Sequence, residues 1–324
     1  MNDTELEMNS LFANSNVVRA KKPLDERSAP HSQSFLQEFW LPSLMLMPAA
    51  IFYLLFFIYP TLYSCYLSFH DWNLMNGKIV FEGLSNYTEL FNDPVFIQSV
   101  TNTLLYVLFT VVPLIILSLL FAVLIENCGP ARVPFRTLMY IPVIISMSVA
   151  GMMWQFVLNP TIGIVNQMLN LLGIDGLNWL NDVRTALGVI IVVGIWRGLG
   201  TNVVLFIAAL KGVPKEQIEA AKVDGANAWQ VFRYVIHPAI LHVTIFVFIT
   251  TIISCFQVFT TIQVMTMGGP NNSTNMLVFQ VWQEAFQFFD IGRATSISTI
   301  MFIILLLLST LVMRAMDRKS NFEN

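Results

Sequence analysis

Two stretches inside otherwise apolar segments carry side chains that can bind a polar solute. In the stretch VGIWRGLGTNVV, four residues recur at i, i+3, i+4 and i+7 and so share one helix face: Gly194, Arg197, Gly198 and Thr201. In the stretch TTIISCFQVF, a second set has the same spacing, with Gln257 beside it: Thr251, Ser254, Cys255 and Val258. Polar groups inside an apolar segment are costly and therefore indicate function. The two stripes predict a shared, water-filled path for a solute.

Arg197 is the most informative of these side chains, because an unpaired guanidinium beside lipid is energetically costly. Its planar fork suits bidentate hydrogen bonds to a carboxylate or a phosphate. We therefore expect Arg197 to face the path and to contact an anionic solute. A gate and an ion pair with a partner subunit are the alternatives for Arg197. For the stripes as a whole the alternative is helix packing, which small residues in membrane helices commonly serve.

A second cluster of chemistry lies in EAAKVDG, a polar stretch between two long apolar segments. Pro214 suits the first turn of a helix, where its missing N–H costs nothing. Gly225 is expected to end that helix, because glycine tolerates the left-handed conformation of a C-terminal cap. A second helix is predicted from about Ala226 to Pro238, with Asp224 as the cap at its start. By these arguments alone, a solvated connector on a membrane surface remains an open interpretation.

The elements that position these residues are predicted to be membrane-spanning helices. Only 11% of the 324 residues are charged, and mean hydropathy is +0.66. A helix needs about 20 consecutive apolar residues to cross a bilayer. Six segments meet or approach that length: about 41–64, 100–125, 137–158, 186–210, 239–262 and 294–313. The sequence therefore predicts an all-α integral membrane protein with six transmembrane helices.

Lys and Arg in the connecting segments predict the orientation, because such residues concentrate on the cytoplasmic side. One set of segments contains thirteen of them: Arg19, Lys21, Lys22, Arg27, Arg132, Arg136, Lys211, Lys215, Lys222, Arg233, Arg314, Arg318 and Lys319. The opposite set contains three: Lys78, Arg184 and Arg293. Both termini and the EAAKVDG stretch are therefore expected to be cytoplasmic, and the protein to be multi-pass.

The predicted organisation has three parts. Residues 1–38 form a cytoplasmic, largely disordered tail, residues 39–316 the six-helix domain with its polar loop at 211–238, and residues 317–324 a cytoplasmic tail. The three cysteines and four histidines show no metal-ligand spacing. No span offers a paired Asp–Asp, Ser–Lys or HExxH arrangement, and no Walker A pattern is present. We therefore expect neither catalytic nor metal-binding residues.

The polar loop resembles a known motif. Glu-Ala-Ala, three residues, a glycine, nine residues and a hydrophobic–x–x–Pro ending are similar to the EAA loop of ABC-importer permeases. In that family this loop forms a coupling helix that sits in a groove of a cytoplasmic ATPase. The resemblance implies the ABC type I importer permease fold. It assigns ATPase coupling to Glu219, Ala220, Ala221, Asp224 and Gly225. His237, where the family usually has Leu, is a departure.

Further stretches resemble the carbohydrate-uptake branch, and in particular the maltose-type first permease subunit. They are FEGLSNYTELFNDPVFIQSVTNT (81–103), WQFVLNPTIGIVNQMLNLLGIDGLNWLND (154–182) and TMGGPNNST (266–274). No loop is long enough for the large extra periplasmic domain of the maltose subunit. In those relatives the sugar cavity is lined by the helix before the EAA loop and by the helix before the Gly-Gly-Pro segment. That implication agrees with the two stripes.

The resemblance also implies partners. They are a second homologous permease subunit, an ATPase dimer in the cytoplasm, an extracytoplasmic solute-binding protein, a carbohydrate substrate and membrane lipid; nucleic acid is not expected. The chain itself would bind no cofactor, since ATP and Mg belong to the partner ATPase. An acidic sugar, such as a uronate or a phosphate ester, would suit Arg197. An ABC permease for a peptide, an amino acid or an ion is the nearest alternative, and a self-contained transporter or channel is a more distant one.

Overall fold

The computed structural model describes residues 35–320, with side chains described for residues 42–314. The chain divides after Pro60 into two compact units, each described here by itself. Almost all of the predicted N-terminal tail lies outside the described residues. At the other end, helix α16 continues to Ser320, into the predicted C-terminal tail.

The first unit is one long apolar segment. Helix α2 (Phe35–Tyr53) passes into the π-helical turn η1 (Leu54–Ile58), and α3 (Tyr59–Leu67) continues the chain past Pro60 into the second unit. The candidate span Pro42–Leu67 has a mean hydropathy of 1.9, and none of its most apolar window is buried within the chain. A helix that is apolar on all faces is stable only with lipid or another protein around it.

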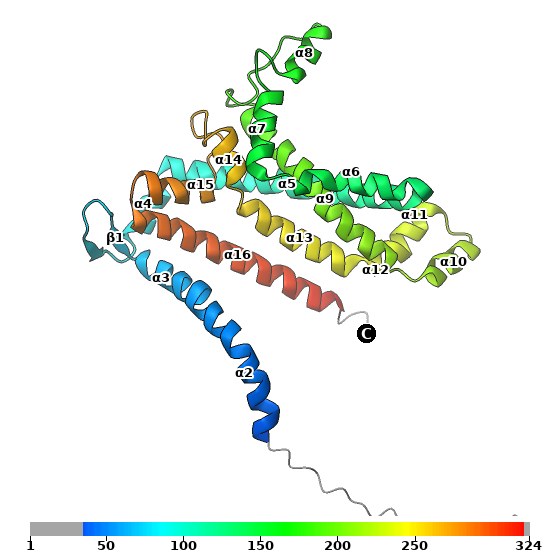
Figure 1. Cartoon of the computed structure of the whole chain (residues 1–324), viewed down its shortest axis with the longest axis horizontal. Coiled ribbons are helices and arrows are strands. Elements are labelled where there is room, and N and C mark those ends of the chain that lie inside the picture. The colour runs from blue at the N-terminus through cyan, green and yellow to red at the C-terminus, as the bar shows by residue number, and fades with distance from the viewer. Residues whose placement is uncertain (1–34, 321–324) are drawn as a thin grey trace, which may run out of the picture. The chain divides into compact units, whose positions relative to one another are not determined.

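The second unit is built on long helices that lie side by side (Figure 1). They are α5 (Pro94–Asn127), α9 (Ala186–Lys211), α13 (Leu241–Phe256) and α16 (Ile291–Ser320). Helix α5 begins at Pro94, where the Asp93 carboxylate accepts a hydrogen bond from the Val95 amide, so the cap and the proline together fix its start. Buried side chains from α5, α9 and α13 form the central core, including Tyr106, Val193 and Phe256.

Two helix pairs among the described residues are sharply bent, one within the predicted span 137–158 and one at the start of the predicted span 239–262. Helix α6 (Arg132–Ile144) and helix α7 (Met147–Val157) meet at 98°. The second bent pair, at 68°, joins Ala228–Ala239 to α13. Within the part of the chain that the structure describes, four helices are long and apolar enough to cross a membrane alone, and up to six spans result if each bent pair counts as one.

Proline explains where these breaks fall. Pro142 lies in the last turn of α6 and cannot donate the backbone hydrogen bond that would hold that turn, and Ile145 then turns to extended geometry (φ −70°, ψ 133°). Pro238 lies two residues before the second break. Helix α5, in contrast, continues through Pro113 as one element. A proline near the end of a helix thus allows a sharp change of direction that the apolar pattern alone does not reveal.

A small β-hairpin and short helices close one end of the bundle, here called the hairpin end. Strand β1 (His70–Trp72) pairs antiparallel with β2 (Ile79–Phe81), His70 opposite Phe81. The hairpin is the one sheet among the described residues of an otherwise helical chain. The helical elements there are α4 (Ser85–Asn92), α15 (Leu277–Trp282) and the π-helical turn η4 (Gln283–Gln287).

Helix α8 (Ile164–Leu171) lies on an arm that projects beyond α7 (Figure 1). Asn166, which is 2% exposed, holds this arm together. Its amide nitrogen donates to the Pro160 and Leu177 carbonyls, and its amide oxygen accepts from the Leu177 backbone and the Trp179 indole at 2.7–3.2 Å. One buried side chain therefore supplies four hydrogen bonds that join α8 to the segments before and after it.

We expect the Asn166→Ala substitution to loosen the arm selectively. Each lost hydrogen bond costs about 1 kcal/mol net, so the local loss is about 2–4 kcal/mol. Thermolysin should then cut near Leu171 and Leu172, which are already 87% and 75% exposed, much faster than in the wild type. Asn170→Ala on the same helix, at an exposed position, is the matched control. Equal cleavage of both variants would contradict this role of Asn166.

Candidate functional site

A cavity of about 610 Å³ lies among α5, α6, α9 and α13. Its wall includes all nine residues that the two sequence stripes single out: Gly194, Arg197, Gly198, Thr201, Thr251, Ser254, Cys255, Gln257 and Val258. The last two lie where α13 has ended at Phe256 and the chain has unwound before α14 (Thr260–Met265). The structure therefore brings both stripes to one space. Their use as a substrate pathway remains a prediction.

Several wall residues escaped the sequence analysis. They are polar or aromatic groups on four helices, α5, α9, α13 and α14: Tyr106, Thr110, Asn202, Thr250, Thr260 and Thr261. A signal for some of them was present, since Tyr106 and Thr110 stand four residues apart within an apolar span and share a helix face. Asn202 donates to the Thr251 hydroxyl at 3.1 Å and so connects α9 to α13. The Thr110 hydroxyl is buried without a partner among the described residues.

Arg197 provides the only charge among the residues that line the cavity. One guanidinium nitrogen donates to the Ile145 carbonyl at 2.7 Å, at the break between α6 and α7. The acidic residues near the span ends pair elsewhere, Glu126 with Arg132 and Lys211 and Glu284 with Arg293. Whether Arg197 contacts a solute, a gate or a partner subunit stays a prediction. A guanidinium carries five N–H donors, so those not used by Ile145 remain for a solute in the cavity.

The two glycines of the fourth span have a packing role as well as a place in the wall. A Cβ atom at Gly194 would collide with the Tyr106 hydroxyl, and one at Gly198 would lie 2.7 Å from a Leu114 methyl carbon. Both neighbours are on α5, the helix against which α9 packs. Helix packing and cavity lining, which the sequence presented as alternatives, therefore apply together to Gly194 and Gly198.

The polar loop forms the opposite end of the bundle, here called the loop end. Helix α10 (Lys215–Val223) ends at Gly225, which has φ +83°. The Ala226 amide donates to the Ala221 carbonyl at 3.0 Å and the Gly225 amide to Lys222 at 3.1 Å, the two hydrogen bonds of a Schellman C-cap. The predicted helix stop at Gly225 is confirmed.

The prediction that Asp224 caps the following helix is wrong. Asp224 is the C-cap of α10, and Asn227 is the N-cap of α11 (Ala228–Val231). Asn227 and Gln230 form a reciprocal capping box, with bonds of 2.9 Å and 2.8 Å. The Schellman turn places Asn227, rather than Asp224, in the extended geometry that an N-cap needs. The remaining turns before the break are η3 (Phe232–Ile236) and α12 (His237–Ala239).

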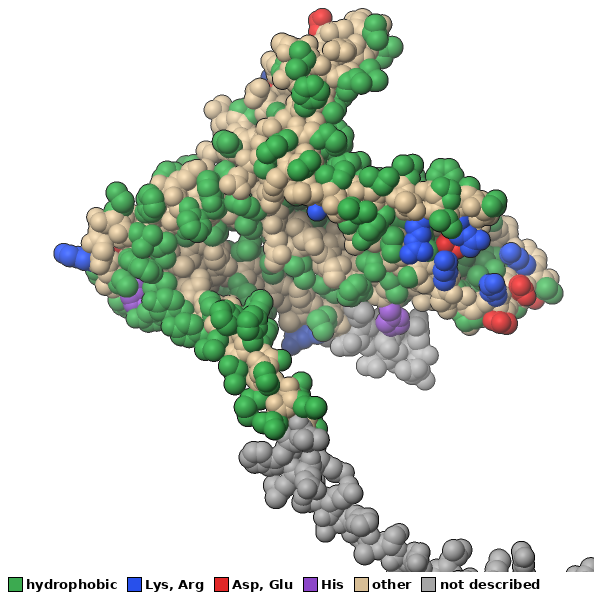
Figure 2. Space-filling view, viewed as in Figure 1, with side chains coloured by type: hydrophobic (Ala, Val, Ile, Leu, Met, Phe, Trp, Pro, Cys, Tyr) green, Lys and Arg blue, Asp and Glu red, His purple; other side chains and the backbone are tan. Residues whose placement is uncertain are grey.

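The surface of this loop is both charged and apolar. Glu219, Ala220, Asp224 and Gly225 are exposed, and Ala221 is half-buried. Figure 2 shows Lys and Arg side chains gathered at the loop end. Large apolar side chains are exposed beside them, with Val223 at 87%, Trp229 at 69% and Tyr234 at 74%. Exposed large apolar side chains therefore stand among charged residues at the loop end.

Ion pairs connect the loop end to the helices behind it. Glu126, at the end of α5, lies 3.4 Å from Arg132 and 3.7 Å from Lys211 at the end of α9. These pairs are partly exposed, so each contributes little to stability. They do hold α5, α6 and α9 in register where the loop begins.

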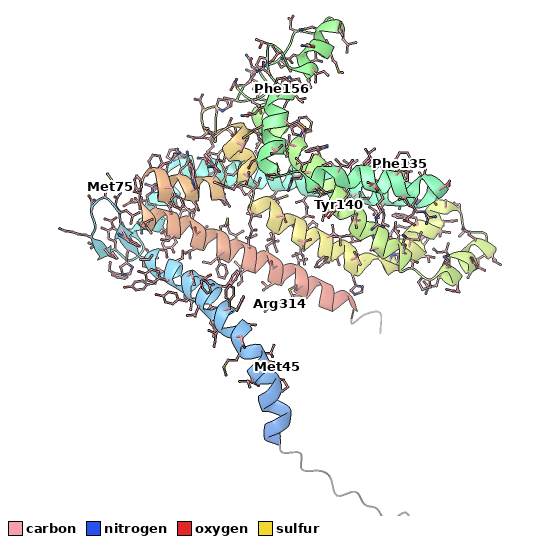
Figure 3. All side chains as sticks on the ribbon, viewed as in Figure 1. Met45, Met75, Phe135, Tyr140, Phe156 and Arg314 are labelled. Atoms are coloured by element: carbon pink, nitrogen blue, oxygen red, sulfur yellow. The ribbon has the colours of Figure 1, made fainter. Side chains whose placement is uncertain are left out.

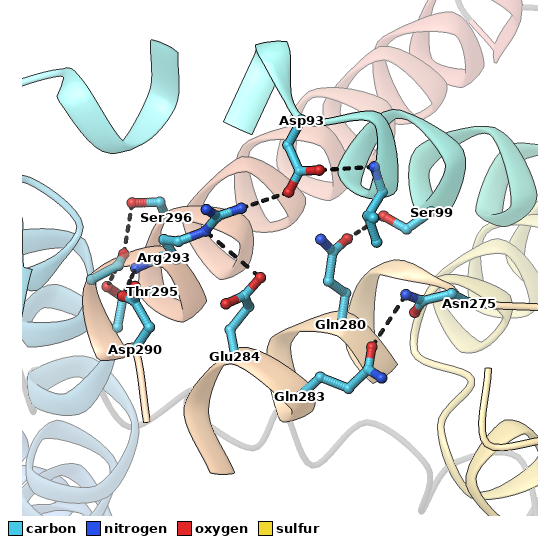
Figure 4. Close-up of polar contacts among 12 residues, drawn as sticks. Asp93, Ser99, Asn275, Gln280, Gln283, Glu284, Asp290, Arg293, Thr295 and Ser296 are labelled. Carbon is cyan, nitrogen blue, oxygen red and sulfur yellow. Dashed lines mark hydrogen bonds and ion pairs between the residues drawn. The ribbon is translucent and has the colours of Figure 1, made fainter. Parts of the chain in front are cut away.

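The hairpin end contains a tighter polar network (Figure 4). Arg293 pairs with Asp93 at 2.6 Å and lies 3.6 Å from Glu284. The Gly-Gly-Pro segment is held on α5 by Asn102, whose amide donates to the Asn272 and Asn275 carbonyls at 2.8 and 2.9 Å. The sequence did not indicate this network, because its members come from segments about two hundred residues apart.

Glu284 should make the stability of the hairpin end depend on pH. Burial raises the pKa of its carboxyl, and burial likewise raises the pKa of Asp290, while Arg293 opposes both shifts. A carboxyl whose pKa is raised on folding stabilises the folded state when the pH is below its ordinary pKa of about 4.3. That contribution to stability is lost as the pH rises through the raised pKa. We therefore expect thermal stability to fall as pH rises above about 4.3, and the fall to be smaller in Glu284→Gln. Glu82→Gln, an exposed acid just before α4, is the control, and equal pH profiles for the two variants would contradict the assignment.

Comparison with known proteins gives one consistent result. Residues 129–321 match the family model described as binding-protein-dependent transport system inner membrane component. The chain is 34% identical to the probable ABC transporter permease protein YurN of Bacillus subtilis (strain 168), over 85% of this chain and 95% of the relative. It is 33% identical to the arabinooligosaccharides transport system permease protein AraP of Halalkalibacterium halodurans, over 83% and 85%.

Two further similarities extend this result. The chain is 27% identical to the sn-glycerol-3-phosphate transport system permease protein UgpA of Pectobacterium atrosepticum, over 90% of this chain and 99% of the relative. Among solved structures, a chain of a bacterial alginate ABC transporter in complex with an alginate pentasaccharide-bound periplasmic protein matches with a TM-score of 0.76. It shares 21% identity over 86% of this chain and 94% of that chain, and so shows the fold.

Proposed function

The chain belongs to the family of binding-protein-dependent transport system inner membrane components, and from this premise we propose that it forms half of the translocation pathway of an ATP-driven carbohydrate importer. It is a multi-pass membrane permease subunit and not an enzyme. Relatives named for arabinooligosaccharides and sn-glycerol 3-phosphate support a carbohydrate or a polyol phosphate as the solute. The non-sugar alternative is not favoured.

One structural observation supports this proposal above the others. Helix α9 ends at Lys211 and α13 begins at Leu241, and the polar loop with α10 is the only chain between them. Both helices line the cavity. A force applied to α10 is therefore transmitted directly to two walls of the space that holds the solute. This arrangement suits a permease that is driven by ATP hydrolysis in a separate subunit.

We assign the parts accordingly. The loop end faces the cytoplasm, as the excess of Lys and Arg there favours, and α10 docks on an ATPase dimer through its exposed face. A second, homologous permease subunit supplies the other half of the pathway, and an extracytoplasmic binding protein delivers solute at the hairpin end. ATP and Mg are bound by the ATPase, and this chain binds no cofactor. Alternation between two states is then biased by ATP and solute.

The experiment is reconstitution. The tagged chain, with the second permease and the ATPase that co-purify with it, is placed in vesicles, and uptake of labelled sugars is measured with ATP inside and binding protein outside. We expect uptake only when all components and ATP are present. Vesicles with the chain alone are the control. Solute movement in that control would show a self-contained transporter and overturn the proposal.

A further inference from the structure

The break between α6 and α7 lies in the wall of the cavity. Val143, just before the break, and Met147, just after it, both line the space. Between them the Ile145 carbonyl has left the helical pattern and accepts a hydrogen bond from Arg197 at 2.7 Å. Among the described residues, Arg197 is the one donor to that carbonyl. The single charged group in the cavity wall is thus also the group that donates to the free carbonyl at the bend.

A solute anion would compete for this guanidinium. The Ile145 carbonyl lies at the C-terminal end of α6, where a positive charge is favourable but interacts only with partial charges. A carboxylate or a phosphate carries a full charge and forms stronger hydrogen bonds with Arg. The donors that Ile145 does not use bind such an anion first, and the bidentate geometry that the anion favours draws the guanidinium away from the carbonyl. The weakened hydrogen bond to the Ile145 carbonyl is unfavourable. A change in the backbone angle at 145–146 would then let the Ile145 carbonyl find another hydrogen-bond donor, which lowers the free energy.

A change at the bend would be passed to the far side of the cavity. The Gln155 amide, on α7, donates to the Val264 carbonyl at 2.7 Å and to the Met265 carbonyl at 3.2 Å. Both carbonyls belong to α14. That helix begins with Thr260 and Thr261, which line the cavity. Helices α7 and α14 are therefore joined by Gln155, and α14 leads into the Gly-Gly-Pro segment that Asn102 holds at the hairpin end.

We propose that Arg197 is a positioning residue that couples solute occupancy to the α6–α7 bend, and through α7 and α14 to closure of the cavity on the side of the hairpin end. The inference rests on the proposed function for the presence of a transported solute. It adds the structural route by which binding of that solute changes the conformation of the chain. It also names the chemical class that uses the route, namely anionic sugars with a carboxylate or a phosphate.

The test is the distance across the bend. Spin labels on genetically encoded non-natural residues at positions 135 and 156 report on α6 and α7, because Phe135 and Phe156 are exposed on either side of the break (Figure 3). This labelling leaves the three cysteines in place. Helix α7 is about 15 Å long, so a change of about 15° moves its far end by about 4 Å. The assembled complex is used throughout.

We expect saturating D-glucuronate, but not D-glucose, to shift the 135–156 distance by about 3 Å in the wild type, because only part of that end movement lies along the line between the two labels. Arg197→Leu should show an altered distance without any ligand and no response to glucuronate. Thr201→Val, one turn along α9 in the same wall, should keep the wild-type distance whatever its uptake. Arg197→Lys, should the leucine variant not assemble, should give an intermediate shift.

An unchanged distance in every intact Arg197 variant would overturn the inference, and so would a glucuronate response that persists in Arg197→Leu. These outcomes are independent of the proposed function. Should ATP-driven uptake fail while glucuronate still shifts the bend through Arg197, the coupling stands and the importer assignment falls. If ATP-driven uptake proceeds but the 135–156 distance changes with neither the ligand nor the substitution, only the proposed coupling is wrong.

Discussion

Replacement of Gly225 by valine is expected to abolish most ATP-driven uptake while the chain still enters the membrane. Gly225 has φ +83°, a conformation that a β-branched residue adopts only with strain. The cost of about 1–2 kcal/mol corresponds to a five- to thirty-fold loss of the correct turn. The Schellman bonds from Ala226 and Gly225 then weaken, and α10 loses its fixed end. Uptake and ATP hydrolysis by the reconstituted complex are the measurements.

Gly225→Asn is the matched control, because asparagine tolerates the left-handed region far better than valine. No atom lies within 4 Å of a Cβ added at Gly225, so crowding within the chain does not explain a difference between the two variants. We expect the asparagine variant to retain most uptake and the valine variant to hydrolyse ATP without transporting. Wild-type uptake by Gly225→Val would contradict the role of this turn in coupling.

The second large effect is expected from Arg197→Leu, measured as selectivity. A hydrogen bond to a charged group contributes about 1.5–3 kcal/mol, so uptake of an acidic sugar should fall about ten- to 150-fold. Uptake of a neutral sugar should fall much less, since it has no charge for Arg197 to bind. Arg184→Leu, which removes an exposed cation outside the cavity, is the matched control and should change neither uptake. Equal losses for acidic and neutral sugars would contradict the assignment of Arg197 to anion binding.

The candidate pathway was predictable because polar residues inside an apolar segment are rare and costly. Helical spacing alone predicted that Arg197 and Thr201 share a face, and the cavity contains both. Spacing did not reveal that Tyr106 and Leu114 of α5 pack closely against Gly194 and Gly198, because that requires knowing which helix lies opposite. The same limit hid Ile145 as the partner of Arg197: a backbone carbonyl at a break carries no sequence signal of its own.

The polar loop illustrates the same limit over a shorter range. Gly225 was identifiable because a left-handed C-cap strongly favours glycine. Asp224 and Asn227 were harder to separate, because both residue types cap helices well. The choice depends on which residue is extended after the turn, and Asn227 is the one that takes that geometry, together with Gln230.

The sequence by itself determined the membrane-spanning class, the number of apolar segments, the charge asymmetry between their ends, and the local features of the polar loop. These follow from composition and from interactions within a few residues, which the chain order already specifies. Only the tertiary structure decided that α6 and α7 turn by 98°, that Arg293 meets Asp93 and Glu284, and that Ile145 is the partner of Arg197. Those outcomes depend on contacts between distant segments. Inside a bilayer, helices associate through packing and polar contacts, and the apolar pattern of a helix does not encode which neighbour it finds.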